Sequence, residues 1–277
     1  TDAMAAAATS AGVDIRTECR VNRILVDGMA VSGVELEGGE RIMADCVVSN
    51  ADPKTTIMDL LGARHVEASF ARRANNIRNR GNAAKLHLAL DGLPGFKGVS
   101  EAQLGQRLVI APSVEYVEKA FNHCKYGEFS TQPVAEIIMP TLHDPGLAPA
   151  GNQVLSAVVH YATRYLGTGW TEGKARFMET VFDLLEIYAP DIREKTTASE
   201  LLTPQDLEIE FGMAGGHWHH AELALDQFLM LRPVPKSAQY ASPMQGLYFC
   251  GAGSHPGGGI MGSAGRNAAR AITGKSS

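Results

Sequence analysis

The glycine-rich stretch near the C-terminal end constrains the fold of this chain most strongly. Residues 247–272, LYFCGAGSHPGGGIMGSAGRNAARAI, combine an apolar strand, a loop with several glycines and a helix of small residues. Within this stretch, Gly257, Gly259 and Gly262 have the GxGxxG spacing of a dinucleotide-binding turn. A true turn of this kind is followed by a helix and a second strand, with an acidic residue about 20 positions on that binds the ribose. No Asp or Glu follows Asp226, so the spacing alone does not make this stretch a Rossmann turn.

The order of strand, glycine loop and helix still favours ligand binding. Backbone N–H groups at a helix start and the positive end of the helix dipole attract an anion or an electron-rich carbonyl. Glycines also let a flat ligand approach the backbone closely. The alternative is a flexible surface turn. Because the charged residues after Asp226 are all basic, we expect a small anionic ligand; few aromatics and no long Lys/Arg stripe argue against nucleic acid. These basic residues are Arg232, Lys236, Arg266, Arg270 and Lys275.

Composition places the chain among soluble globular proteins. Its 277 residues, 45% of them apolar, can form one large core or two modest ones. Four well-separated cysteines without a CxxC pair indicate neither a disulfide framework nor a thiolate zinc site, so we predict a reducing, cytoplasmic location. No apolar run reaches the roughly 20 residues of a membrane span, and no signal peptide is recognisable. The chain starts on Thr1 and enters a helix directly, which suggests that an upstream segment has been removed.

Local patterns predict a mixed α/β chain. A β-meander is expected over residues 13–50, where apolar alternation is divided by Asp-Gly and Gly-Gly turns. Asp52 is placed to cap a helix that starts at Pro53, and Thr203 to cap a short helix with Pro204 first and Asp206 third. Further helices are predicted at 2–11, 113–125, 171–189 and 260–272, and strands at 83–92, 107–112, on both sides of a loop at 143–152, and at 247–252.

Three parts of the sequence carry a resemblance to a known family. LYFCGAGSHPGGGIMGSAG is similar to the C-terminal flavin-contacting segment of the phytoene desaturase-like FAD-dependent oxidoreductases. AAATSAGVDIRTECRVNRILVDGMAVSGVELEGGERIMADCVVSNADP resembles the mid-chain meander of that family and the strand that returns to its nucleotide domain. PVAEIIMPTLHDPGLAPAGNQVLS and FGMAGGHWHHAELALDQFLMLRP point to one subgroup. In the family, the βαβ unit with the true GxGxxG lies near the N-terminus, so the resemblance implies that this chain is only the C-terminal half.

The resemblance implies an α/β fold in two parts. Residues 1–52 and 237–277 would be the remaining part of an FAD-binding domain, a β-meander plus a C-terminal strand and helix. Residues 53–236 would be a substrate domain with a mixed, mainly antiparallel sheet covered by helices. The intact protein would transfer hydride from a C–H bond of a small hydrophobic or amine-like substrate to the flavin. The alternatives are a non-enzymatic fragment or interaction module that does not bind flavin on its own, and a carotenoid or lipid carrier.

The same resemblance assigns cofactor-binding residues. Val21 would offer backbone hydrogen bonds to the adenine, and Asn50 would lie at the end of the returning strand near the cofactor. Gly251, Ala252 and Gly253 would pass beside the ribityl and pyrophosphate groups, and Gly258, Gly259, Ile260 and Met261 would meet the flavin ring. FAD is expected in the intact protein and is expected to be absent or weakly bound in this chain alone.

The GGHWHH segment supplies the substrate-side candidates His217, Trp218 and His219. The alternative is a loop packed on the core, with its imidazoles satisfied by backbone groups. A metal site is not expected, because the adjacent His219 and His220 point in different directions in either regular conformation. No residue is assigned as a catalytic acid or base. Homo-oligomer formation is a further expectation, since apolar surface covered by a missing half would otherwise stay bare.

Overall fold

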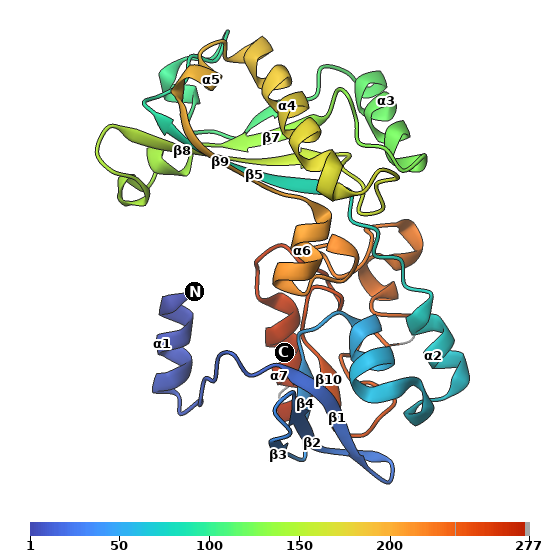
Figure 1. Cartoon of the computed structure of the whole chain (residues 1–277). Helices are drawn as coiled ribbons and strands as arrows, with labels where there is room; N and C mark the ends of the chain where they lie inside the picture. Colours follow the sequence, from blue (N-terminus) through green and yellow to red (C-terminus); the bar gives the residue numbers. More distant parts are fainter. Residues whose placement is uncertain (236, 275–277) are drawn as a thin grey trace. The chain divides into compact units, whose positions relative to one another are not determined.

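The computed structural model describes residues 1–235 and 237–274 (Figure 1). The chain forms two compact units: unit 1 comprises Thr1–Ile77 with Leu223–Ser277, and unit 2 comprises Arg78–Glu222. No helix among the described residues combines the length and apolar character needed to cross a bilayer.

Unit 1 contains the predicted β-meander. Strands β1 (Val21–Asp27), β2 (Ala30–Leu36) and β3 (Arg41–Met43) pair antiparallel in the order β1-β2-β3. The preceding helix α1 (Asp2–Ser10) agrees with the prediction and buries none of its residues. Residues 13–18 form no strand, although their alternation predicted one, because they have no neighbouring strand with which to pair.

A second, parallel pair of strands joins the two ends of unit 1. Strand β4 (Val47–Ser49) pairs with β10 (Leu247–Phe249), with Phe249 opposite Ser49. The meander continues into this pair, since the Val31 N–H donates to the Gln245 carbonyl over 2.9 Å. Parallel pairing thus joins segments about 200 residues apart, which local sequence patterns cannot specify.

The helices that follow β4 belong to unit 1. As predicted, Asp52 Oδ1 accepts a hydrogen bond from the Thr55 N–H over 3.0 Å, and helical turns begin at Pro53. These turns continue as the π-helix η1 (Thr55–Gly62), which is followed by the helices η2 (Ala63–His65) and α2 (Ala68–Asn75), neither of which the sequence predicted.

Unit 2 is built on a five-stranded sheet that is antiparallel throughout. Its strands, in sheet order, are β6 (Leu108–Ile110), β7 (Val134–Ile138), β8 (Asn152–His160), β5 (Ala83–Asp91) and β9 (Thr196–Leu202). Strand β9 was not predicted. It is an edge strand with mostly exposed side chains and little apolar alternation, and it forms by pairing with β5.

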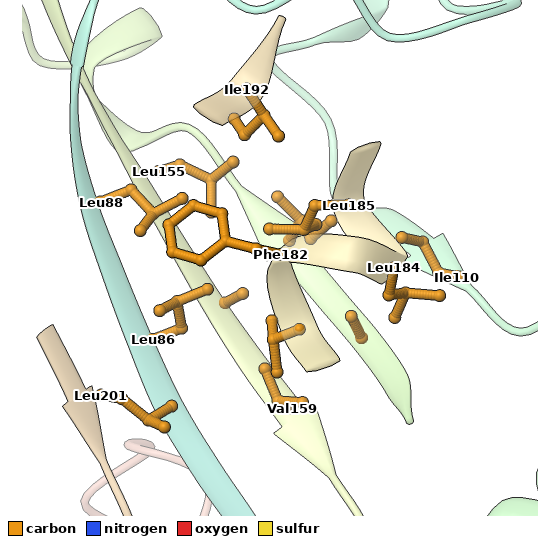
Figure 2. Packing of buried hydrophobic residues seen from close by; sticks show 14 of the residues in the cluster. Leu86, Leu88, Ile110, Leu155, Val159, Phe182, Leu184, Leu185, Ile192 and Leu201 are labelled. Carbon is orange, nitrogen blue, oxygen red and sulfur yellow. The ribbon is translucent and has the colours of Figure 1, made fainter. Parts of the chain in front are cut away.

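Helices cover one face of this sheet (Figure 1). Phe177, Val181 and Leu185 of α4 (Trp170–Tyr188), which the sequence placed on one helix face, belong to the same buried apolar cluster as leucines of the central strands. Figure 2 shows Leu185 of this helix among them. The other helices on this side are α3 (Val114–Lys125) and α5 (Ile192–Lys195). Single turns occur at η3 (Glu101–Gln103), η4 (Pro140–Leu142) and η5 (Pro145–Leu147).

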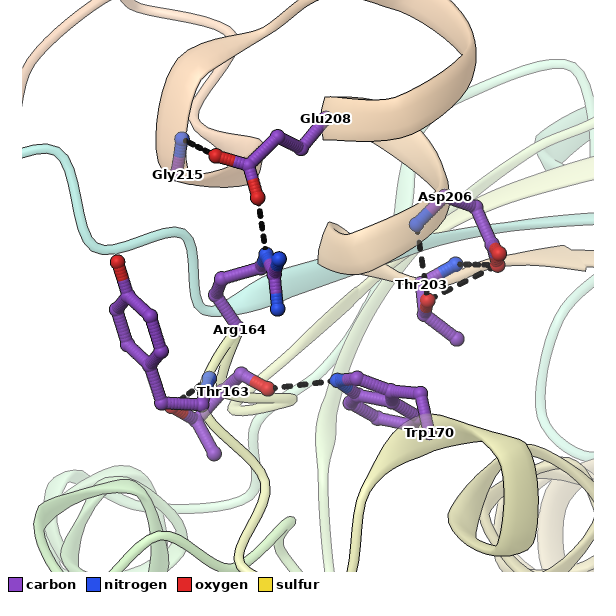
Figure 3. Close-up of polar contacts among 8 residues, drawn as sticks. Thr163, Arg164, Trp170, Thr203, Asp206, Glu208 and Gly215 are labelled. Atoms are coloured by element: carbon purple, nitrogen blue, oxygen red, sulfur yellow. Dashed lines mark hydrogen bonds and ion pairs between the residues drawn. The ribbon is translucent and has the colours of Figure 1, made fainter.

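Helix α6 (Pro204–Phe211) begins and ends as predicted. Thr203 and Asp206 form a reciprocal capping box, in which Asp206 Oδ2 accepts from the Thr203 N–H over 2.8 Å (Figure 3). Gly212 ends the helix in a left-handed conformation. The turn η6 (Ala214–Gly216) then leads to the GGHWHH segment.

The C-terminal part of unit 1 contains two single turns and one helix. These are η7 (Leu225–Gln227), η8 (Leu229–Leu231) and α7 (Ser263–Thr273). The units therefore divide after residues 77 and 222, whereas the predicted domain limits lie at 52/53 and 236/237. The FAD and substrate roles assigned to the two parts stay predictions.

Candidate functional site

Two segments meet at the carboxyl ends of the parallel strands β4 and β10. The Cys250 N–H donates to the Ser49 carbonyl over 3.0 Å, which places the exposed Asn50 and the buried Gly251 on neighbouring strand ends. The carboxyl edge of parallel strands is where ligands bind in open α/β sheets. Of the predicted cofactor residues, the structure thus brings Asn50 and Gly251 together.

The segment from Gly251 to Gly262, here called the glycine turn, connects this strand edge to α7. Gly257, Gly259 and Gly262 have φ angles of 115°, 117° and 64°, and Ile260 has a φ of 61°. A Cβ added at Gly257 or Gly262 would meet no atom within 4 Å, so these backbone positions face open space. The turn therefore presents an accessible glycine backbone, as close ligand approach requires.

The glycine turn also has unused hydrogen-bonding groups. Within residues 1–235 and 237–274, no hydrogen bond from the backbone N–H groups of residues 257–262 is found. In the same part of the chain, the buried Ser254 Oγ and His255 Nδ1 atoms have no partner. Ser254 is only 1% exposed. Because orphaned buried polar groups are costly, two such atoms mark the glycine turn as a candidate site for a polar ligand.

A buried arginine contacts the glycine turn from within unit 1. Arg232 is 1% exposed and donates from Nη1 to the Ala252 carbonyl over 2.6 Å and from Nε to the Gln227 carbonyl over 2.9 Å. Burial lowers the pKa of the Arg232 guanidinium, which nevertheless stays charged at neutral pH. The sequence predicted a basic C-terminal region but did not assign Arg232 to the site; its only signal was the absence of nearby acidic residues after Asp226.

The other predicted cofactor residues lie in different environments. Gly253 is buried, Gly258 and Ala252 are half-buried, and Gly259, Ile260 and Met261 are exposed. Val21 is half-buried at the start of β1, opposite Leu36. The arrangement agrees with a surface at Gly259–Met261 that could meet a ligand, but whether any of these residues holds a cofactor stays a prediction.

The flanking residues of the glycine turn fit a supporting role. Helix α7 packs on β10 through its small-residue face, and Asn267 Nδ2 donates to the Tyr240 hydroxyl over 2.8 Å. Arg266 is exposed. Lys236 and Lys275, counted among the basic residues, lie outside the described residues. Burial raises the pKa of the Cys250 thiol, so this residue is a poor nucleophile at neutral pH, whereas Cys46 is exposed.

In unit 2, the GGHWHH segment is fixed by a carboxylate and by close glycine packing. Glu208 Oε1 accepts from the Gly215 N–H over 2.7 Å, while Glu208 Oε2 accepts from Arg164 Nε (Figure 3). Gly81 donates to the Gly215 carbonyl over 2.8 Å. A Cβ on Gly81, Gly215 or Gly216 would clash with backbone atoms, so we call these three residues the glycine clasp.

The imidazoles that follow the glycine clasp are half-buried. The His219 N–H donates to His217 Nδ1 over 3.3 Å, and the two rings lie 5.9 Å apart; Trp218 contacts the His219 ring edge-on. Among the described residues, no group of three His, Cys, Asp or Glu side chains is arranged to hold a metal ion. Both interpretations of this loop, substrate side or packed support, stay predictions.

A polar sheet face in unit 2 was not singled out by the sequence. On the strand faces opposite the helices, His160 Nε2 lies 2.9 Å from Glu136 Oε1, and Arg107 Nη1 donates to Glu136 Oε2 over 2.9 Å. Burial opposes the charge on Glu136, but the His160 and Arg107 hydrogen bonds outweigh it and lower the pKa of this carboxyl. Burial lowers the pKa of the neighbouring Lys85 and His87. Polar alternation in AAKLHLALD was the signal that could have identified this face.

Comparison with known proteins relates the chain to larger oxidoreductases. No protein-family model matches it. It is 38% identical to the Rattus norvegicus protein "Pyridine nucleotide-disulfide oxidoreductase domain-containing protein 2", over 98% of this chain and 49% of that protein. It is 30% identical to a lycopene-forming phytoene desaturase of Pantoea ananas, over 91% of this chain and 49% of the desaturase.

A solved oxidoreductase from Methanosarcina mazei has a similar fold. The two structures superpose with a TM-score of 0.62 at 18% sequence identity. The matched region covers 99% of this chain and 53% of the Methanosarcina mazei chain. The rat and Pantoea proteins are homologues of the chain, in agreement with the resemblance found in its motifs. The chain spans about half the length of the curated relatives it matches.

Proposed function

We propose that this homologue of pyridine nucleotide-disulfide oxidoreductase domain-containing protein 2 and of the phytoene desaturases is the C-terminal half of an FAD-dependent oxidoreductase. The proposal is supported by similarity along almost the whole chain, which nevertheless accounts for only about half of each relative. It implies that the other half contains the βαβ unit with the true GxGxxG, which binds the FAD pyrophosphate.

The observation that carries the proposal is the structure of the glycine turn. Its N–H groups at residues 257–262 are not used by the described chain, its glycine backbone faces open space, and Ser254 Oγ is buried without a partner. A flavin has a flat ring edged by carbonyl oxygens and ring nitrogens, which can accept from such N–H groups and from a hydroxyl. The donor groups present therefore fit this cofactor.

The proposed roles follow from this arrangement. When bound, FAD supplies the hydride acceptor for oxidation of a substrate C–H bond. Gly258, Gly259, Ile260 and Met261 bind the flavin ring edge, and the start of α7 stabilises negative charge there. Gly251, Ala252 and Gly253 pass the ribityl and pyrophosphate groups, while Val21 and Asn50 complete the cofactor contacts.

The substrate class is the less specific part of the proposal. The name of the Pantoea relative, a phytoene desaturase, favours the hydrophobic alternative over the amine-like one. His217, Trp218 and His219 remain the substrate-side candidates. The cytoplasmic location and self-association remain predictions as well.

Titration of the purified chain with FAD, followed by flavin fluorescence, tests the proposal. We expect weak, saturable binding, since the pyrophosphate contacts of the other half are missing. Gly259→Val puts a branched side chain on the exposed turn and should weaken binding about tenfold, or about 1.4 kcal/mol. Gly12→Val is the matched control, because Gly12 also has a positive φ and no backbone atom near an added Cβ, but it follows α1.

Three outcomes separate the alternatives. Binding that is weakened by Gly259→Val and unchanged by Gly12→Val supports the proposed site. Equal binding by all three proteins overturns the site, and absence of any FAD binding favours the non-enzymatic fragment or interaction module. Sequencing the gene upstream of Thr1 provides a second test, since the proposal requires an encoded βαβ unit with GxGxxG.

A further inference from the structure

Arg232 is the most deeply buried charged residue that the proposed function does not yet use. It is one of the largest side chains that are fully buried, at 1% exposure. Its backbone N–H donates to the Leu229 carbonyl over 3.1 Å, which fixes the residue at the end of η8. The chain therefore places a guanidinium in the interior of unit 1 at a defined position.

Two hydrogen bonds of this guanidinium connect separate segments of unit 1. Nε donates to the Gln227 carbonyl over 2.9 Å and Nη1 donates to the Ala252 carbonyl over 2.6 Å, 20 residues further along the chain. Ala252 lies between Gly251 and Gly253, and the Ser254 N–H donates back to the Gly251 carbonyl over 3.0 Å. Arg232 thus holds Ala252, the residue between two glycines at the start of the glycine turn.

The hydrogen bond from Arg232 to Ala252 matters for the shape of the turn because Ala252 has a glycine on each side. Glycines lose more conformational freedom on folding than other residues, so a glycine-rich segment needs external contacts to keep one conformation. Hydrogen bonds from a charged donor are stronger than those between neutral groups. Burying a cation costs free energy, so a buried arginine is a costly way to fill space alone.

We propose that Arg232 is a positioning residue that fixes the Ala252 carbonyl, and with it residues 251–254, in the conformation on which the cofactor lies. The cofactor part of this inference rests on the proposed function. The guanidinium also brings a positive charge to the turn, which favours the more electron-rich, reduced form of a bound flavin over the oxidised form.

Three variants of the whole 277-residue chain test the proposal. Arg232→Met keeps most of the volume and removes charge and donors. Arg232→Lys keeps the charge but cannot reproduce the planar fork that reaches two carbonyls. Arg266→Met is the control, since it removes the same charge from an exposed position on α7.

The first measurement is hydrogen exchange of residues 247–254 by mass spectrometry, which needs no cofactor; in this segment the N–H groups of Leu247, Phe249, Cys250 and Ser254 are hydrogen-bonded. We expect Arg232→Met to accelerate exchange in this segment about tenfold, corresponding to about 1.4 kcal/mol of lost local stability, with a smaller effect for Arg232→Lys and none for Arg266→Met. Wild-type exchange in Arg232→Met would overturn the positioning role. If Arg232→Met does not fold, Arg232→Lys decides: faster exchange confined to this segment supports the role, and faster exchange throughout unit 1 overturns it.

The second measurement is the midpoint potential of bound FAD. A purely structural role of Arg232 would give the Arg232→Lys and Arg232→Met variants the same potential. We expect Arg232→Met to reduce the preference for reduced over oxidised flavin about tenfold, or about 30 mV for a two-electron couple, and Arg232→Lys to restore most of it. Equal potentials in both variants overturn the electrostatic part. Faster exchange in Arg232→Met together with an upstream gene sequence that encodes no βαβ unit with GxGxxG would retain the positioning role and reject the proposed function.

Discussion

The glycine turn of unit 1 and the glycine clasp of unit 2 use the same residue for opposite purposes. In the clasp, Gly81, Gly215 and Gly216 let backbone segments touch, and a Cβ at any of them would clash with backbone atoms. In the turn, Gly257 and Gly262 face open space, and nothing in the described chain fills it. Glycine is thus needed in the clasp for internal packing and in the turn for conformation and access.

This difference separates stability from binding. Substitution in the clasp forces backbone atoms of unit 2 apart, so the free energy of unfolding should respond most. Substitution in the turn adds backbone strain but no internal clash, so ligand binding should respond most. Variants in both regions test this comparison. Variants of the residues that support the clasp then sharpen it.

The largest expected effect is that of Gly215→Ala. Its φ of 65° disfavours alanine, and the added methyl would clash with the Asn79 carbonyl oxygen, so we expect a loss of about 3–5 kcal/mol in the free energy of unfolding. Gly257→Ala should cost about 1–2 kcal/mol, from backbone strain alone. Urea denaturation measures both values, and equal losses would remove the proposed distinction between the two regions.

A smaller effect is expected when the carboxylate that supports the clasp is neutralised. Glu208→Gln weakens the bonds to Arg164 and the Gly215 N–H and should cost about 1–2 kcal/mol, since Glu208 is partly exposed to solvent. Glu210→Gln, at an exposed position on the same helix, is the matched control and should change stability by less than about 0.5 kcal/mol. Faster exchange of the Gly215 amide should accompany the loss in Glu208→Gln only.

Removal of the α6 cap should have a still smaller effect. Thr203 caps the helix that leads to the clasp, so Thr203→Ala should cost about 1 kcal/mol in thermal or urea unfolding. Thr203 is fully buried, so the alanine variant loses packing as well as the cap. Thr203→Ser is the control, because serine keeps the capping oxygen and loses only the methyl group. A serine variant as unstable as the alanine variant would assign the loss to packing instead of capping.

The smallest effect concerns the pH dependence of the same cap. Burial opposes the charge on Asp206, but hydrogen bonds from Lys174 and Thr203 outweigh it and lower the pKa of this carboxyl below its ordinary value of 3.8. The stabilisation is therefore present above pH 3.8 and is lost as the pH falls through the lowered pKa. Asp206→Asn should be less stable than wild type at pH 6, and the difference should shrink toward pH 2–3; a constant difference would contradict the assignment.

Local elements could be predicted where the deciding residues lie within a few positions of each other. The α6 capping box, the end of that helix at Gly212 and the apolar face of α4 agree with the structure. Helix α2 and strand β9 were missed, because α2 is short and half of its residues are polar, and because β9 depends on pairing with β5. For the candidate site, the glycine turn and its neighbour Asn50 were named in advance, but the contact from Arg232 was not.

The amino-acid sequence by itself determined the locally encoded elements, among them α4, α6, the meander, and a glycine-rich loop between an apolar strand and a small-residue helix, since periodicity, caps and turn residues act over short distances. Only the tertiary structure decided which glycines are packed against backbone and which are open, and where the Arg232 guanidinium donates. These features depend on contacts between segments far apart in the chain. Their geometry arises from packing and from the need to satisfy buried polar groups, which no local pattern records.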